Sequence, residues 1–172
     1  MTGRQRRRQY EYEQLRRLCS ERNDIVLEVT EQDGDGIPTA YAVTYRIHSI
    51  CGIREADHTP LFADEFCMLL TLPDDYPMVD APPEFRFVKK TADHALPWHP
   101  NIRYYGEMAG RVCLNQLNTF TDLAWGVERV ALYLRYELYH ALHEPPYPED
   151  LEVAAWVRQY GEPNEWIFFD QN

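Results

Sequence analysis

Four stretches of alternating apolar and polar residues limit the folds that this chain can adopt. They are DIVLEVTEQ, AYAVTYRIHSI, LFADEFCMLLTL and EFRFV, at residues 24–32, 40–50, 61–72 and 84–88. A period of two places one face of a strand in the core and leaves the other toward solvent. Turns or loops of modest length separate the stretches, so the sequence predicts a four-stranded antiparallel meander.

Helical spacing precedes and follows these strands. Within residues 5–22, apolar side chains recur at helical intervals among arginines and glutamates, which predicts an amphipathic helix. A second helix is predicted from about Leu123 to Leu142, with Thr121 or Asp122 as its N-cap, and a shorter one at residues 151–160. This order predicts an α+β fold: an N-terminal helix, the antiparallel meander, then C-terminal helices.

Length and composition indicate a single globular domain. The chain has 172 residues, of which 45% are hydrophobic and 26% charged, and no run resembles a signal peptide or a membrane span. We expect a domain over residues 1–160 and a C-terminal tail at 161–172 that docks on the body or on a partner. Its four cysteines are widely spaced with no CxxC pair, which favours free thiols and a cytoplasmic location.

The charge is unevenly distributed. The net charge is -11, which argues against nucleic acid as a partner, yet residues 1–22 hold seven arginines and three glutamates. This basic segment is either a docking surface for an acidic protein or a solvated helix face, and its apolar side is too thin to favour a membrane. The arginines of interest are Arg6, Arg7, Arg8, Arg16 and Arg17.

The stretch HPNIRYYGEMAGRVCLNQL, at residues 99–117, contains the residues with the clearest chemical interest. A metal site would use His94, His99 and Cys113, but zinc loops usually supply two close ligand pairs, and here only the histidines are close. A Cys–His hydrolase would pair Cys113 with His99 or His140, but no protease signature surrounds the cysteine. The remaining alternative is a buried structural thiol.

The order of motifs resembles the ubiquitin-conjugating enzyme family over about residues 5–160. An N-terminal helix and a meander precede a YP…PP segment, an HPN tripeptide and a Cys-Leu that comes before a Trp-led helix. The residues that carry the resemblance are Tyr76-Pro77, Pro82-Pro83, His99-Pro100-Asn101, Cys113-Leu114 with Leu117, Trp125 and Glu144-Pro145.

The resemblance implies a transferase that accepts a ubiquitin-like protein from an activating enzyme as a thioester on Cys113 and passes it to an amine of a protein substrate. It assigns oxyanion stabilisation to Asn101. His99 and Pro100 then shape the loop, with His99 as general base a lesser alternative, and Glu149 or Asp150 is an acidic gate or part of a solvated turn. The resemblance also implies that the activating enzyme docks on the N-terminal helix, as it does in the family. No cofactor or metal is implied, and the need for a ligase stays open.

Several features depart from the family pattern. The loop between Asn101 and Cys113 is longer than usual, and residues 78–81 lengthen the YP…PP segment. The divergence, the two lysines and the short C-terminus also resemble conjugating enzymes of bacterial ubiquitin-like systems, which would suggest a role in antiviral defence. The alternative function is a non-catalytic module of the same fold that holds a ubiquitin-like protein or a complex.

Overall fold

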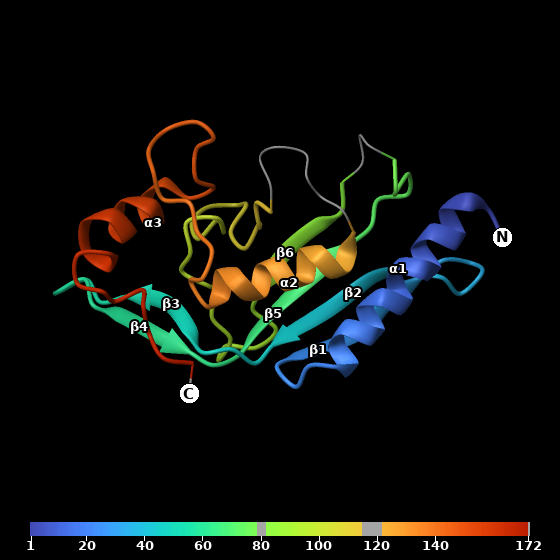
Figure 1. The fold of residues 1–172 in the computed structure, drawn as a ribbon, viewed down its shortest axis with the longest axis horizontal. Helices are drawn as coiled ribbons and strands as arrows, with labels where there is room; N and C mark the ends of the chain where they lie inside the picture. Colours follow the sequence, from blue (N-terminus) through green and yellow to red (C-terminus); the bar gives the residue numbers. More distant parts are fainter. Residues whose placement is uncertain (79–81, 115–121, 172) are drawn as a thin grey trace.

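The computed structural model describes residues 1–78, 82–114 and 122–171, and its architecture is α+β as expected (Figure 1). The helices are α1 (Gly3–Ser20), α2 (Leu123–Leu134), α3 (Leu151–Trp156) and a π-helical turn, η1 (Val157–Gly161). The strands are β1 (Ile25–Gln32), β2 (Pro38–Tyr45), β3 (Ser49–Ile53), β4 (Pro60–Ala63), β5 (Phe66–Thr71) and β6 (Glu84–Val88).

The predicted four-stranded antiparallel sheet is confirmed, in the order β1-β2-β5-β6. The second and third predicted strands are each divided, because a separate β3–β4 hairpin leaves the sheet between β2 and β5. Two cores explain this division. Ile47 packs into the core under the main sheet, whereas Ile50 packs into a second core beside α3. The chain therefore bends where its apolar residues change from one core to the other.

Helix α1 begins with a capping box, in which Thr2 and Gln5 exchange side-chain and backbone hydrogen bonds. Its buried face contains Arg8 and Glu11 as well as Leu15. Arg8 was predicted to lie on an exposed docking surface, but this prediction is wrong. Its guanidinium is buried and donates to the carbonyl oxygens of Pro73 and Asp74, at 2.9 and 2.8 Å. A buried guanidinium needs such acceptors, so Arg8 anchors the segment after β5 and is not part of an exposed docking surface.

Helix α2 is shorter than predicted. Asp122 caps it by accepting from the backbone N–H of Trp125 at 2.8 Å, but the helix ends at Leu134. Tyr136 has a φ of 55°, a left-handed conformation that α-helix cannot continue through. Leu138 and Ala141, predicted on the apolar stripe, instead reach the two cores from the irregular segment that follows.

The C-terminal residues pack on the body. Turn η1 crosses the predicted domain boundary at residue 160, and Ile167 is 1% exposed in the second core with Trp156 and Val157. Figure 1 shows α3 and the β3–β4 hairpin at the opposite end of the molecule from the N-terminus. In the described part of the chain, no helix has the length and apolar character required to cross a bilayer.

Candidate functional site

Two short segments pair antiparallel and bring Asn101 and Cys113 together. The backbone N–H of Cys113 donates to the carbonyl of Asn101 at 2.9 Å, and Ile102 forms a bridge with Val112. The next pair is Arg103 with Arg111, whose backbone N–H and carbonyl are 2.9 Å apart. Directly opposite residues share a face and successive pairs alternate. Asn101, Cys113, Arg103 and Arg111 therefore lie on one face, and Ile102 and Val112 lie on the other.

Helix α2 holds the chain as it leaves Cys113. The Tyr133 hydroxyl lies within hydrogen-bond distance of the carbonyls of Cys113 and Leu114, at 3.0 and 3.2 Å, and Arg129 donates to Leu114 at 2.9 Å. Cys113 itself is partly exposed. All four cysteines are free thiols, as predicted, and burial raises the pKa of the other three, that of Cys19 to about 11.

The amide of Asn101 has a fixed orientation. Its Oδ1 accepts from the backbone N–H of His140 at 3.0 Å, and the residue is 7% exposed. A backbone N–H can bond only to an acceptor, so this contact identifies the oxygen and leaves Nδ2 as the outward donor. Among the described residues, Nδ2 has no hydrogen-bond partner. An oriented, unused amide donor thus lies beside a partly exposed thiol.

His99 is a structural residue of this loop. Nδ1 accepts from the backbone N–H of Asn101 at 3.1 Å, and Nε2 donates to the carbonyl of Leu138 at 3.0 Å. Its ring stacks on Tyr133 with centroids 4.7 Å apart, and complete burial lowers its pKa to about 3. Both ring nitrogens are occupied, so His99 can act neither as a general base nor as a metal ligand in this conformation.

The two candidate acidic residues have different roles. Asp150 is 4% exposed and accepts three backbone N–H groups, from Tyr104, Glu152 and Val153, so its carboxylate caps α3. Its own N–H donates to the carbonyl of Pro100 at 3.0 Å. Asp150 therefore fixes the segment before α3 against the HPN loop.

Glu149 lies on the same side as Cys113. Its Oε1 accepts two hydrogen bonds from Arg111, at 2.9 and 2.7 Å, and one from Arg103 at 3.4 Å. Neither Arg103 nor Arg111 was among the residues predicted for the site. The sequence does place an arginine near each end of the loop RYYGEMAGRV. Whether the two ends meet depends on the turn inside the loop, which the sequence pattern does not specify.

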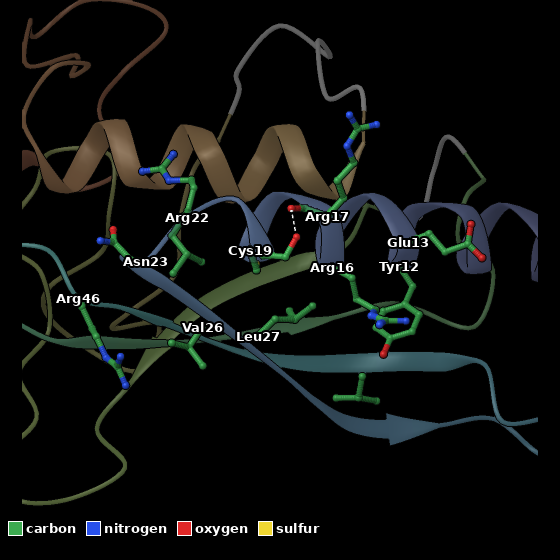
Figure 2. A pocket seen from close by; sticks show the side chains of 13 residues that line it. Tyr12, Glu13, Arg16, Arg17, Cys19, Arg22, Asn23, Val26, Leu27 and Arg46 are labelled. Carbon is green, nitrogen blue, oxygen red and sulfur yellow. Dashed lines mark hydrogen bonds between the residues drawn. The ribbon is translucent and has the colours of Figure 1, made fainter.

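The exposed arginines of α1 lie on a separate surface. A groove of about 860 Å³ separates the C-terminal half of α1 from β1, and Arg16, Arg17 and Arg22 line it. Figure 2 shows these side chains with Tyr12 on α1 and with Val26 and Leu27 on β1. Arg16 lies 5.7 Å from the centre of the Tyr12 ring, and Arg17 pairs with Glu21 at 3.1 Å. Arg7 pairs with the buried Glu11 at 3.0 Å, and Arg6 is exposed.

Known proteins resemble this chain in sequence and in fold. The family model described as ubiquitin-conjugating enzyme matches residues 18–165. None of the curated proteins matches the chain. The structure is similar to the H. polymorpha ubiquitin conjugating enzyme Pex4p, solved in complex with the soluble domain of Pex22p. The TM-score is 0.56 at 18% identity, and the match covers 96% of this chain and 93% of that one. It is also similar to the E2 domain of a Toxoplasma gondii ubiquitin conjugating enzyme, with a TM-score of 0.53, 19% identity and coverage of 92% and 89%.

The buried His99 predicts how stability depends on pH. Its pKa is about 3 in the folded chain, against an ordinary value of 6.5. Between these values the unfolded chain binds a proton that the folded chain excludes, so stability present above pH 6.5 is lost as the pH falls toward 3. We expect the stability advantage of wild type over His99→Gln, measured by urea unfolding, to shrink by about 2 kcal/mol between pH 7 and pH 5. A stability difference between wild type and His99→Gln that is the same at pH 7 and at pH 5 would contradict the buried neutral state of His99.

Proposed function

The chain belongs to the ubiquitin-conjugating enzyme family, and from that premise we propose that it carries a ubiquitin-like protein as a thioester on Cys113. It accepts the modifier from an activating enzyme and transfers it to an amine of a protein substrate. The observation that carries this proposal is the pairing of a partly exposed Cys113 with the oriented amide of Asn101. A module that only binds its partners would need neither group.

The first step is a thioester exchange. The Cys113 thiolate attacks the carbonyl carbon of the modifier's thioester, and the cysteine thiolate of the activating enzyme leaves as the new C–S bond forms. One thioester replaces another, so the reaction is nearly balanced and requires an accessible thiol more than a strong neighbouring base. The structural role of His99 is compatible with this chemistry, because the step does not depend on a Cys–His pair.

The second step is an aminolysis. A substrate amine attacks the thioester carbon, negative charge develops on the carbonyl oxygen, and the C–S bond then breaks to release the Cys113 thiolate while the amine's extra proton passes to water. A donor already aimed at the developing oxyanion stabilises the transition state without reorganising. We assign this donor to Nδ2 of Asn101, because His140 holds the opposite end of the same amide.

Glu149 is the better candidate for the acidic gate. Asp150 is occupied by three backbone donors, whereas all three arginine hydrogen bonds to Glu149 fall on Oε1. Among the described residues Oε2 has no hydrogen-bond partner, so it can accept from an incoming ammonium group. Arg103 and Arg111 hold this carboxylate on the face that Cys113 shares.

Docking of the activating enzyme is assigned to the exposed arginines of α1. Arg6, Arg7, Arg16 and Arg17 are exposed on α1 and are the residues proposed for this role, whereas Arg8 is buried. A local positive surface on a chain with a net charge of -11 favours approach by an acidic partner surface from that side.

Substitution of Cys113 tests the carrier role. The protein is mixed with its activating enzyme, ATP and modifier, and the product is run on a non-reducing gel. Wild type should give a band shift that reductant removes, and Cys113→Ser a shift that survives reductant, because thiols do not readily cleave an oxyester. Cys113→Ala should give no shift, and normal charging of that variant would reject the assignment.

Asn101→Ala separates the two steps. Charging of Cys113 should remain close to wild type, because a thiolate attacks a thioester readily and displaces another thiolate, so this step depends less on an oxyanion donor than aminolysis does. Discharge to excess free lysine should slow by about a hundredfold, the usual cost of losing one oxyanion donor. The measurement is the single-turnover loss of preformed thioester. Equal discharge rates would reject the oxyanion role, and a charging defect of the same size would indicate that the loop has collapsed.

Charge reversal on α1 tests the docking surface. Arg6→Glu with Arg16→Glu should slow charging at low salt and make its rate less sensitive to added salt, because electrostatic steering is screened as ionic strength rises. The control is Arg54→Glu, an exposed arginine beside the β3–β4 hairpin that should leave charging unchanged. A charging rate equal to wild type in the double variant would leave these arginines as a solvated helix face.

A further inference from the structure

A pocket of about 410 Å³ opens beside the paired segments that hold Cys113. Arg103 and Tyr105, from the longer loop after Asn101, form one wall, and residues 147–152 form the other. Three large side chains at the pocket are about half exposed: Tyr105 at 47%, Tyr147 at 51% and Leu151 at 49%. Large apolar surfaces grouped around a pocket indicate a binding site more often than single exposed residues do.

Negative charge surrounds the aromatic part of this pocket. The lining includes Arg103 against three carboxylates, Glu149, Asp150 and Glu152. The pKa of Tyr105 is raised, mainly because burial removes its hydroxyl from water. The negative charges of Glu152, Asp150 and Glu55 raise this pKa further. Glu55 and Glu152 are exposed, and neither forms an ion pair with a described residue. A cation that entered beside Tyr105 would therefore meet uncompensated carboxylates.

Aromatic rings with nearby carboxylates are the groups that bind an organic cation. The ring faces attract a guanidinium or ammonium group, and the flexible methylene stem of lysine or arginine packs on apolar surface such as that of Leu151. We propose that this pocket binds a lysine or arginine side chain of the acceptor protein, close to the lysine that receives the modifier. The proposal rests on the proposed function, whose acceptor it specifies.

The position of the pocket supports this role. Arg103 belongs both to the pocket and to the pair of residues next to Asn101 and Cys113, on the same face. An extended acceptor chain with its lysine at Cys113 would therefore place a neighbouring residue at the pocket. At the end of the pocket nearest Cys113, the guanidinium of Arg103 pairs with Glu149. The acceptor's cation would therefore lie at the other end, beside Tyr105 and Glu152. The longer loop, which departs from the family pattern, supplies Tyr105.

Direct binding can be measured without any activity. We would titrate the isotope-labelled full chain with acetyl-Gly-Arg-Gly-amide and with its citrulline analogue, which keeps the shape of arginine but lacks the charge, and follow backbone amide shifts by NMR. The arginine peptide should shift Tyr105, Leu151 and Glu152 and bind about threefold more tightly than the citrulline peptide. Glu152→Gln should remove that preference. Glu31→Gln, the same charge change at an exposed position on β1, should keep it. Equal affinities for the two peptides, or shifts outside the pocket, would overturn the proposal.

A kinetic measurement then separates this proposal from the proposed function. Charged enzyme is discharged to peptides that hold arginine or citrulline at successive distances from one lysine, with ethanolamine as a nucleophile that does not reach the pocket. At the best spacing the arginine peptide should react about threefold faster, and the advantage should disappear in Glu152→Gln alone. If the enzyme charges on Cys113 but reacts equally fast with the arginine and citrulline peptides at every spacing, the pocket proposal is wrong. An enzyme that does not charge on Cys113 overturns the proposed function, while the NMR result still decides the pocket.

Discussion

The antiparallel pairing of residues 101–103 with 111–113 is the contact on which the rest of the site depends. One backbone hydrogen bond places Cys113 opposite Asn101, and the next places Arg111 opposite Arg103. Period-two alternation then puts all four side chains on one face. The two arginines on that face bind Glu149, which the segment before α3 supplies. Gly110 permits this pairing: its φ is 92°, and a Cβ there would lie 2.0 Å from the carbonyl oxygen of Phe87. Any other residue would separate the loop from β6.

The early end of α2 provides the other half of the site. After the left-handed Tyr136, the chain leaves helical geometry and offers unpaired backbone groups, as helix ends do. The carbonyl of Leu138 accepts from His99, and the N–H of His140 donates to Asn101. A helix continued to Leu142 would have used these groups internally. The shortened helix thus orients both the structural histidine and the amide of the HPN segment.

The sequence was sufficient for local features and insufficient for those that depend on distant partners. Alternation correctly placed Tyr41, Val43 and Tyr45 in the core, and the HPN and Cys-Leu motifs identified the family. The length of α2 was wrong because Leu138 and Ala141 keep helical spacing while packing from an irregular segment. The placement of Arg8 on an exposed docking surface was wrong, because its guanidinium binds carbonyl oxygens some 65 residues away, and no periodicity in the sequence reveals such a contact. The roles of Arg103 and Arg111 depend on a loop register that spacing alone leaves undetermined.

Charge divides the proposed surfaces between two parts of the molecule. A net charge of -11 attracts basic proteins from every direction, but at physiological ionic strength such attraction fades within about 8 Å. Selection must therefore come from local groups. The arginines of α1 form one local exception to the negative field, and α1 lies at the end of the molecule away from α3 (Figure 1). The pocket beside Tyr105 adds aromatic contact to carboxylates next to Cys113. An acidic activating enzyme would then be drawn to the arginines of α1, and a basic acceptor to the pocket beside Tyr105. The two partners would therefore not compete for one surface of this protein.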